Sequence, residues 1–296
     1  MSAVVQQDTL ADDVHRSTMQ RALRRLLRNR LGLVSLVIVV LMLIAGALAG
    51  VIAPHPPEAT NFGAALQRPG TLGYLLGTDE LGRDQISRVL HGLGASASVA
   101  FGALLVAFVI GVPLGMLSGI YRTADAVVSR FSELLLALPF LLLAIGMATI
   151  TGPSLSVAAV AIGISTIPTI IRVMRVETMR ISSLDFVTAA YVQGSGHGRV
   201  LWRYVLPNAA SALIVQATIL IPSAIIAEAM LSFLGLGIQP PMPSLGRMLS
   251  DAQQYAGTAP WLAIVPGLVI VVICICFNTF GDALRDALDV QSSGDA

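Results

Sequence analysis

About six long apolar runs divide the chain, and each has close to the roughly 20 residues that a helix needs to cross the hydrocarbon core of a bilayer. The pattern therefore predicts an all-α membrane protein. The first run is too long for the core of a signal peptide, so we expect it to remain as an uncleaved span. The predicted spans are residues 31–52, 96–120, 134–150, 155–171, 210–226 with an extension to about 236, and 261–280.

Arginine indicates the side of the membrane on which the two ends lie. All 18 of the lysine-plus-arginine residues are arginine. An even number of crossings places both termini on one side, and cytoplasmic loops carry an excess of positive residues. We therefore expect both termini in the cytoplasm. Every arginine falls on that side except Arg68, Arg83, Arg88 and Arg247.

The polar segments between the spans give the expected domain organisation. The inner loop at 172–208 is the most informative segment, because it alternates arginine with apolar residues in a helical rhythm. In chain order we expect a cytoplasmic N-terminal segment (1–30), a first transmembrane helix (31–52), an extracytoplasmic loop (53–95), the main transmembrane domain (96–282) and a cytoplasmic tail (283–296).

Composition excludes a soluble domain. Hydrophobic residues make up 55% of the chain and charged residues 12%, with a mean hydropathy of +0.80, whereas soluble domains carry roughly 25% charged residues. A net charge of +1 gives no indication of a nucleic-acid partner. Cys274 and Cys276 fit neither a CxxC redox pair nor a metal-ligand spacing, so we interpret them as inert core thiols.

Glycines recur one helical turn apart in the first two spans. Gly46 and Gly50 lie in the first span, and Gly111, Gly115 and Gly119 lie in the second. This spacing lets neighbouring helix backbones approach closely. We therefore expect tight helix packing at these positions.

The inner loop predicts two short helices joined by a turn. Ser182 and Ser183 precede Asp185 in the arrangement of a capping box, which starts a helix, and residues 184–193 can form about three turns. Gly194 and Gly196 suit the left-handed geometry of a helix end. A second helix is expected at about 199–205, with a turn at Pro207 because proline lacks the amide donor.

The first of these helices presents a small-sided face. Phe186, Ala189, Ala190 and Gln193 share one side at helical spacing. Small side chains allow a close fit into the groove of a partner protein. The alternative is an amphipathic helix that rests at the lipid interface.

Two strings in this loop carry a resemblance to a known family. Residues 189–194 (AAYVQG) and 206–208 (LPN) resemble the "EAA…G…LP" loop of permease subunits of binding-protein-dependent ABC importers, although Thr188 stands where that motif has its glutamate. In that family the loop is the coupling helix, which docks into a cleft on the nucleotide-binding subunit. The coupling residues implied here are Asp185, Phe186, Ala189, Ala190, Gln193, Gly194, Leu206 and Pro207.

Three further strings, in the same order as in the family, indicate a particular subfamily of these permeases. Residues 76–84 (LGTDELGRD), 231–246 (LSFLGLGIQPPMPSLG) and 281–289 (GDALRDALD) are similar to the second permease subunit of dipeptide, oligopeptide and nickel importers, although Val290 replaces a usual proline. The resemblance implies a type I importer core of five helices at 96–282, in the plasma membrane of a prokaryote. It implies a homologous second permease, two ABC ATPase subunits, an extracytoplasmic substrate-binding protein and small peptides as cargo.

The chain offers no candidate for catalysis. Without lysine it cannot contain the P-loop, whose lysine reaches the nucleotide phosphates, so we expect ATP and magnesium on the partner subunits. The sequence contains neither an HExxH zinc motif nor a GxSxG nucleophile motif. We expect no catalytic residue, no metal and no cofactor bound by this chain.

Charged residues at membrane depth are functional candidates, because burying a charge there is costly. Glu133 follows Arg130 by one helical turn, which favours a salt bridge. Glu228 is either an interfacial residue in contact with water or, with Ser232 and Phe233, part of the translocation pathway or outer gate.

The outer segment contains a charged turn at Asp79, Arg83 and Asp84. It either contacts a binding protein or the partner permease, or it is a solvated, self-paired turn. Two other functions stay open beside the importer. One is a secondary transporter in which Glu228 or Glu133 titrates, and the other is a membrane scaffold that transports nothing.

Overall fold

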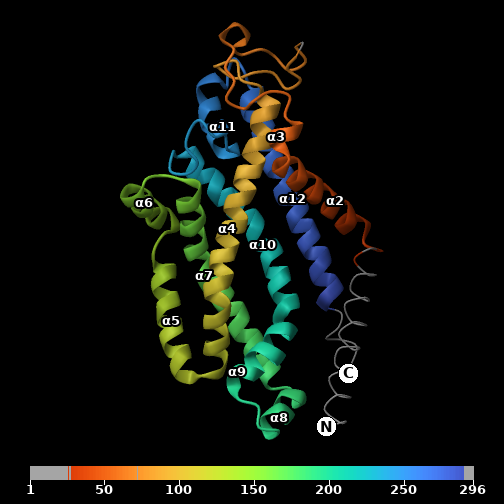
Figure 1. The fold of residues 1–296 in the computed structure, drawn as a ribbon, viewed down its shortest axis with the longest axis vertical. Helices are drawn as coiled ribbons and strands as arrows, with labels where there is room; N and C mark the ends of the chain where they lie inside the picture. Colours follow the sequence, from red (N-terminus) through yellow and green to blue (C-terminus); the bar gives the residue numbers. More distant parts are fainter. Residues whose placement is uncertain (1–25, 27, 72, 290–296) are drawn as a thin grey trace.

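The computed structural model describes residues 26, 28–71 and 73–289, and their regular structure is helical (Figure 1). Among these residues, five helices are long and apolar enough to cross a membrane, and a sixth span results if the bent pair α5 and α6 counts as one. The all-α membrane fold is therefore confirmed. The elements are α2 (Arg30–Ala47), α3 (Ala49–Ile52), η1 (Phe62–Ala64), α4 (Gln85–Ile120), α5 (Arg122–Ala137), α6 (Phe140–Thr151), α7 (Leu155–Ser182), α8 (Asp185–Val192), α9 (His197–Val200), the π-helical η2 (Leu201–Val205), α10 (Leu206–Phe233), α11 (Leu245–Ala252), η3 (Gln253–Tyr255) and α12 (Trp261–Asp289).

The long helices α4, α7, α10 and α12 run lengthwise through the molecule, and α2 packs beside α12 and α4 (Figure 1). The two ends of this bundle differ. One end carries residues 53–84 together with α11 and η3, and we name it the cap end. The other carries α8, α9 and η2, and we name it the elbow end. Most of the predicted segment 1–30 and residues 290–296 of the predicted tail lie outside the described residues.

The glycines of α4 pack directly on α7, as predicted. A Cβ added at Gly115 would lie 2.7 Å from the Cβ of Met174 and 2.8 Å from the carbonyl oxygen of Ile171. Gly111 and Gly119 meet α7 in the same way, one turn before and one turn after. Only glycine lets these two helix backbones come so close.

In the first span the glycine prediction is half right. Gly46 meets the backbone of Gly94 on α4, where an added Cβ would lie 2.8 Å from the amide nitrogen. Among the described residues, nothing lies within 4 Å of a Cβ added at Gly50, so the expectation of tight packing there is wrong. Gly50 lies in α3, beyond the break at Leu48 that separates α3 from α2.

The third predicted span, 134–150, is not one straight helix. It falls on α5 and α6, which are bent by 82° at a short break. The break contains Pro139, and the residue before a proline is driven out of helical geometry. Leu138 accordingly has φ −87° and ψ 119°. The proline therefore splits one apolar run into two helices.

The helix α4 begins at Gln85, well before the predicted span at 96. Asp84 caps it by accepting a hydrogen bond from the Ser87 amide at 3.1 Å. The first turns of α4 carry buried polar side chains, among them Gln85 and Arg88. These polar residues made the segment resemble an exposed loop in the sequence.

The two largest hydrophobic clusters among the described residues form most of the core. The larger fills the bundle towards the cap end and includes Val99, Ile225 and Ile273. The smaller fills the elbow half and joins Met174 of α7 to Val187 of α8. Cys274 and Cys276 are buried free thiols in the larger cluster, as the interpretation of them as core residues expects.

Candidate functional site

The helix α8 projects beyond the ends of the long helices at the elbow end (Figure 1). The predicted helix 184–193 is thus present as Asp185–Val192, but the predicted capping box is wrong. Leu184 occupies the N-cap position without a side-chain hydrogen bond. Ser183 instead donates its hydroxyl to the carbonyl of Arg180 at 2.8 Å. Ser183 therefore helps to close the end of α7, where carbonyl groups lack helical partners.

The glycines after α8 behave differently from one another. Gly194 has φ +84° and ends α8 in left-handed geometry, as predicted, whereas Gly196 has φ −71° and does not. The predicted turn at Pro207 is also wrong. The helical run continues from His197 to Phe233. The π-helical η2 lies directly before Pro207, so the missing N–H of the proline falls where the regular α-helical bonding is already interrupted.

Two buried residues of α8 hold it on the bundle, Tyr191 is partly buried against the same core, and the other residues of the helix are exposed. Val187 and Ala190 are buried, at 0% and 5% exposure. Ala190 therefore faces the core and not a partner, which corrects its place on the predicted face. The predicted residues Asp185, Phe186, Ala189, Gln193 and Gly194 are exposed.

The exposed side of α8 is largely apolar. Leu184, Phe186 and Val192 are exposed at 39%, 43% and 84%, and Ala189 lies among them. Phe186 also contacts Tyr204 of η2, with ring centroids 6.4 Å apart. An exposed apolar patch with a polar rim is typical of a protein interaction site. Leu206 and Pro207 are the first residues of α10, which follows η2, and are not part of α8.

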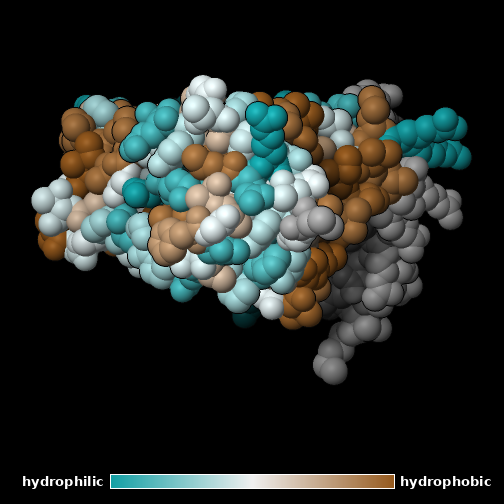
Figure 2. All heavy atoms as spheres, turned by 90° about the horizontal axis from the view of Figure 1, so that it is seen from above, coloured by the Kyte–Doolittle hydropathy of each residue, from teal (hydrophilic) through white to brown (hydrophobic). Residues whose placement is uncertain are grey.

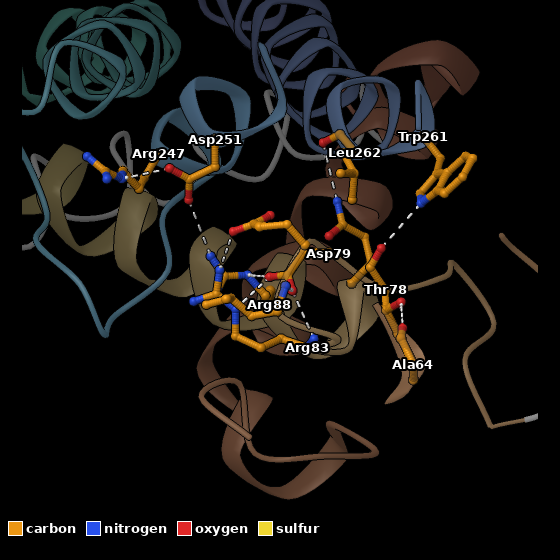
Figure 3. Close-up of polar contacts among 12 residues, drawn as sticks. Ala64, Thr78, Asp79, Arg83, Arg88, Arg247, Asp251, Trp261 and Leu262 are labelled. Atoms are coloured by element: carbon orange, nitrogen blue, oxygen red, sulfur yellow. Dashed lines mark hydrogen bonds and ion pairs between the residues drawn. The ribbon is translucent and has the colours of Figure 1, made fainter. Parts of the chain in front are cut away.

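At the cap end, the charged turn is buried and cross-linked by ion pairs (Figure 3). Asp79 accepts from Arg83 Nε at 2.6 Å and lies 3.3 Å from Nε of Arg88 on α4. Nη2 of Arg88 lies 3.8 Å from Asp251 of α11, which also pairs with Arg247 at 3.1 Å. Asp79, Asp84 and Arg88 are buried. The turn is therefore self-paired through Asp79 and Arg83, as one alternative expected, but it is not solvated. We name Asp79, Arg83, Arg88, Asp251 and Arg247 the cap network.

Neutral hydrogen bonds hold the same segment down beside the cap network (Figure 3). The Thr78 hydroxyl donates to the carbonyl of Ala64 and accepts from the Gln67 amide at 2.9 Å. The Trp261 indole N–H donates to the Thr78 carbonyl at 3.5 Å. Figure 2 views this end of the molecule, where polar residues cover the middle and hydrophobic residues gather towards the sides.

Glu228 lies inside the bundle and is not in contact with water. Its carboxylate accepts from the hydroxyls of Ser96 on α4 at 2.5 Å and of Ser232 at 2.6 Å, and its exposure is 0%. The interfacial alternative is therefore wrong for this structure. Phe233, the third predicted residue of the gate, is partly exposed and does not join this group. Glu133 forms the predicted salt bridge with Arg130 at 2.9 Å on the surface.

Several residues of these sites were not predicted from the sequence. Arg88, Asp251 and Trp261 join the cap through contacts between distant parts of the chain, and Ser96 reaches Glu228 across two helices. No motif or spacing relates these positions. A buried arginine near the start of a span is the one signal that could have identified the cap network, since a charge there needs a partner.

Comparison with known proteins places the chain in a family. The family model described as a binding-protein-dependent transport system inner membrane component matches residues 111–290. A second model, described as the N-terminal TM domain of oligopeptide transport permease C, matches residues 17–69.

Named relatives align over nearly the whole chain. The dipeptide transport system permease protein DppC of Alkalihalophilus pseudofirmus is 38% identical, over 92% of this chain and 90% of that protein. The DppC protein of Haemophilus influenzae is 40% identical, over 88% and 91%. The DppC protein of Escherichia coli is 38% identical, over 98% of both.

Solved structures share the fold at lower identity. A chain of the MetNI methionine ABC transporter is 21% identical, with a TM-score of 0.57 over 67% of this chain and 95% of that one. A chain of an amino acid ABC transporter is 15% identical, with a TM-score of 0.51 over 67% and 93%. These structures support the type I importer fold. The chain belongs to the family of inner-membrane components of binding-protein-dependent transport systems.

Proposed function

We propose that this chain is a permease subunit of an ATP-driven importer of small peptides, and that α8 is its docking surface for the ATPase. The exposed apolar side of α8 at the elbow end carries the proposal. The substrate class follows the dipeptide permeases to which the chain is similar. The family favours this function over the secondary transporter considered from the sequence.

An importer of this family works with ATPase and substrate-binding partners. For this chain we propose two ATPase subunits at the elbow end, which then lies in the cytoplasm, and a binding protein at the cap end. A homologous second permease completes the pathway. The arginine distribution supports this orientation, since Arg172, Arg180 and Arg199 lie near the elbow end.

The cap network gives the outer end a rigid platform. Its ion pairs join residues 79–83 to α4 and α11. Asp79, Arg83 and Asp84 therefore act by shaping the surface that a binding protein meets, and buried Asp79 and Asp84 do not contact that partner themselves.

Movement starts at α8 and reaches the cap end through α10. Since His197–Phe233 is one helix, a displacement of the elbow shifts its far end, where Glu228 is bonded to α4. A conformational change needs a difference in interaction energy between its two states. The ATPase supplies that difference at α8, and Ser232 and Phe233 lie where α10 opens or closes the outer gate.

A charge on the docking surface tests the proposal. In proteoliposomes that contain the partner subunits, Ala189→Asp should lower ATP-dependent dipeptide uptake by about tenfold or more, because an unpaired charge buried at an interface costs about 2–5 kcal/mol. Thr123→Asp adds the same charge at the exposed first turn of α5 and should leave uptake near wild type. Wild-type uptake by Ala189→Asp would contradict the docking surface. Uptake driven by an ion gradient without ATP would contradict the importer itself.

A further inference from the structure

His197 lies between two tyrosine rings where the elbow meets the corner of α4 and α5. Its ring centroid is 5.2 Å from that of Tyr191 on α8 and 5.5 Å from that of Tyr121. Both distances fall within the range of favourable ring pairs, which is about 4.5–7 Å. We name Tyr121, His197 and Tyr191 the ring bridge.

Each ring of the bridge belongs to a different structural element. Tyr191 lies on α8, and His197 is the first residue of the helix that continues to Phe233. Tyr121 is at once the C-cap of α4 and the N-cap of α5. The ring bridge therefore touches the docking helix, the helix that follows it and the corner between two others.

The corner that carries Tyr121 is fixed to its neighbours. Asp125 of α5 accepts from the Ser118 hydroxyl of α4 at 2.8 Å and from Nη2 of Arg175 of α7 at 2.6 Å. A displacement of Tyr121 is therefore transmitted to α4, α5 and α7. The corner cannot move independently of these helices without breaking these hydrogen bonds.

The buried contacts of α8 do not replace the ring bridge. Val187 and Ala190 seat α8 on the elbow core and Phe186 contacts Tyr204 of η2, but apolar burial by itself has no preferred direction. Ring pairs have preferred separations and tilts, and those of His197 are 54° with Tyr191 and 36° with Tyr121. The bridge thus sets the angle of α8 relative to the corner.

We infer that the ring bridge passes the displacement of α8 to the α4–α5 corner, with His197 as the positioning residue. This inference rests on the proposed function of α8. It predicts that loss of the His197 ring leaves the importer assembled and able to hydrolyse ATP, but less able to convert hydrolysis into transport.

The test is the number of ATP molecules hydrolysed per peptide imported, measured in proteoliposomes of the assembled importer. His197→Ala should raise this ratio by about twofold to twelvefold, the range that the energy of a ring pair corresponds to. His197→Phe keeps a ring and should stay close to wild type. Gly198→Ala is the matched control, because its added Cβ meets nothing within 4 Å.

A second pair of variants guards against loss of assembly. Tyr121→Ala should raise the ratio as His197→Ala does, and the double variant should add nothing further, since both remove one pathway. An unchanged ratio in His197→Ala, additive effects, or failure of His197→Phe to rescue would overturn the inference. If His197→Ala does not assemble, the ratio in Tyr121→Ala decides.

Thiol cross-linking distinguishes failure of the proposed function of α8 from failure of the ring bridge. In the same preparations, Ala189→Cys reports whether α8 meets the ATPase. Absence of that cross-link contradicts the proposed function. A retained cross-link with unchanged ratios in His197→Ala and Tyr121→Ala contradicts the ring bridge alone.

Discussion

The hydroxyl of Ser96 on α4 donates to the carboxylate of Glu228 on α10 at 2.5 Å, and both side chains are buried. The Ser232 hydroxyl donates to the second carboxylate oxygen of Glu228 and accepts a hydrogen bond from the Ile238 amide at 3.2 Å. One buried acid thus joins α4, α10 and the segment that leads to α11.

Removal of this acid should loosen the cap half of the bundle. Glu228→Ala leaves the Ser96 and Ser232 hydroxyls without their acceptor, and each unsatisfied buried group costs about 1–3 kcal/mol. Glu228→Gln keeps one carbonyl oxygen and should cost less. Thermal unfolding of the detergent-purified protein measures the loss, with Ser223→Ala on the exposed side of α10 as the control. Equal melting temperatures for Glu228→Ala and Ser223→Ala would contradict this account.

Apolar run length and glycine spacing predicted most of the bundle, because both follow from chemistry that is local in the sequence. Pro139 itself is a local signal for the bend, but the prediction followed the length of the apolar run and ignored the proline. The early start of α4 could not be predicted, because Arg88 becomes acceptable in a helix core only through Asp79 and Asp251.

The candidate site likewise has parts that the sequence predicted and parts that it could not. The predicted helix at 184–193 is present as α8, and Gly194 ends it as predicted. Which alanine faces outward depends on the seat that α7 and η2 provide, so the burial of Ala190 was not readable from α8 alone. The ring bridge needs the corner at Tyr121, which is far from α8 in sequence.

The buried and exposed arginines should differ sharply in their contribution to stability. Arg88→Met leaves Asp79 with one cation fewer in a buried site, and breaking a buried pair costs about 3–5 kcal/mol. Arg130→Met breaks the exposed pair with Glu133, which is worth roughly 0–1 kcal/mol. Melting temperatures of the two variants test this difference. A similar, small shift for both would show that the cap network is not a stabilising element.

The glycine contact between α4 and α7 predicts a steric effect at a single methyl group. In Gly115→Ala the new Cβ meets Met174 and the backbone of α7 below 3 Å. The helices must separate, and overpacking of this kind costs about 1–3 kcal/mol. Gly50→Ala has open space and should be neutral or stabilising. Yield and melting temperature of the two purified variants provide the comparison, and a stable Gly115→Ala would refute the close approach.

Glu80 should make the stability of the cap depend on pH. Burial raises the pKa of its carboxyl above the ordinary 4.5, and Asp79 adds to the shift, while a hydrogen bond to its own backbone and Arg83 oppose it. The folded protein then binds this proton more tightly than the unfolded chain, so stability falls as the pH rises from 4.5 through the raised pKa.

Glu80→Gln cannot ionise and isolates this effect. It should be more stable than wild type at neutral pH, and the difference should shrink as the pH falls towards 4.5. Glu58→Gln, exposed in the same segment, corrects for the loss of one negative charge. Melting temperatures across the pH range give the measurement. A difference that does not change with pH would contradict the raised pKa.

The contact between α8 and the ATPase is the central claim, and cross-linking from Ala189→Cys in native membranes tests it most directly. The natural thiols at Cys274 and Cys276 are buried, and Ala190→Cys, next in the chain but facing the core, is the unreactive control. We predict an adduct with the ATP-hydrolysing subunit that forms only with reagent on the cytoplasmic side. An adduct that lacks this subunit, or labelling of Ala189→Cys from outside the cell, would contradict the account.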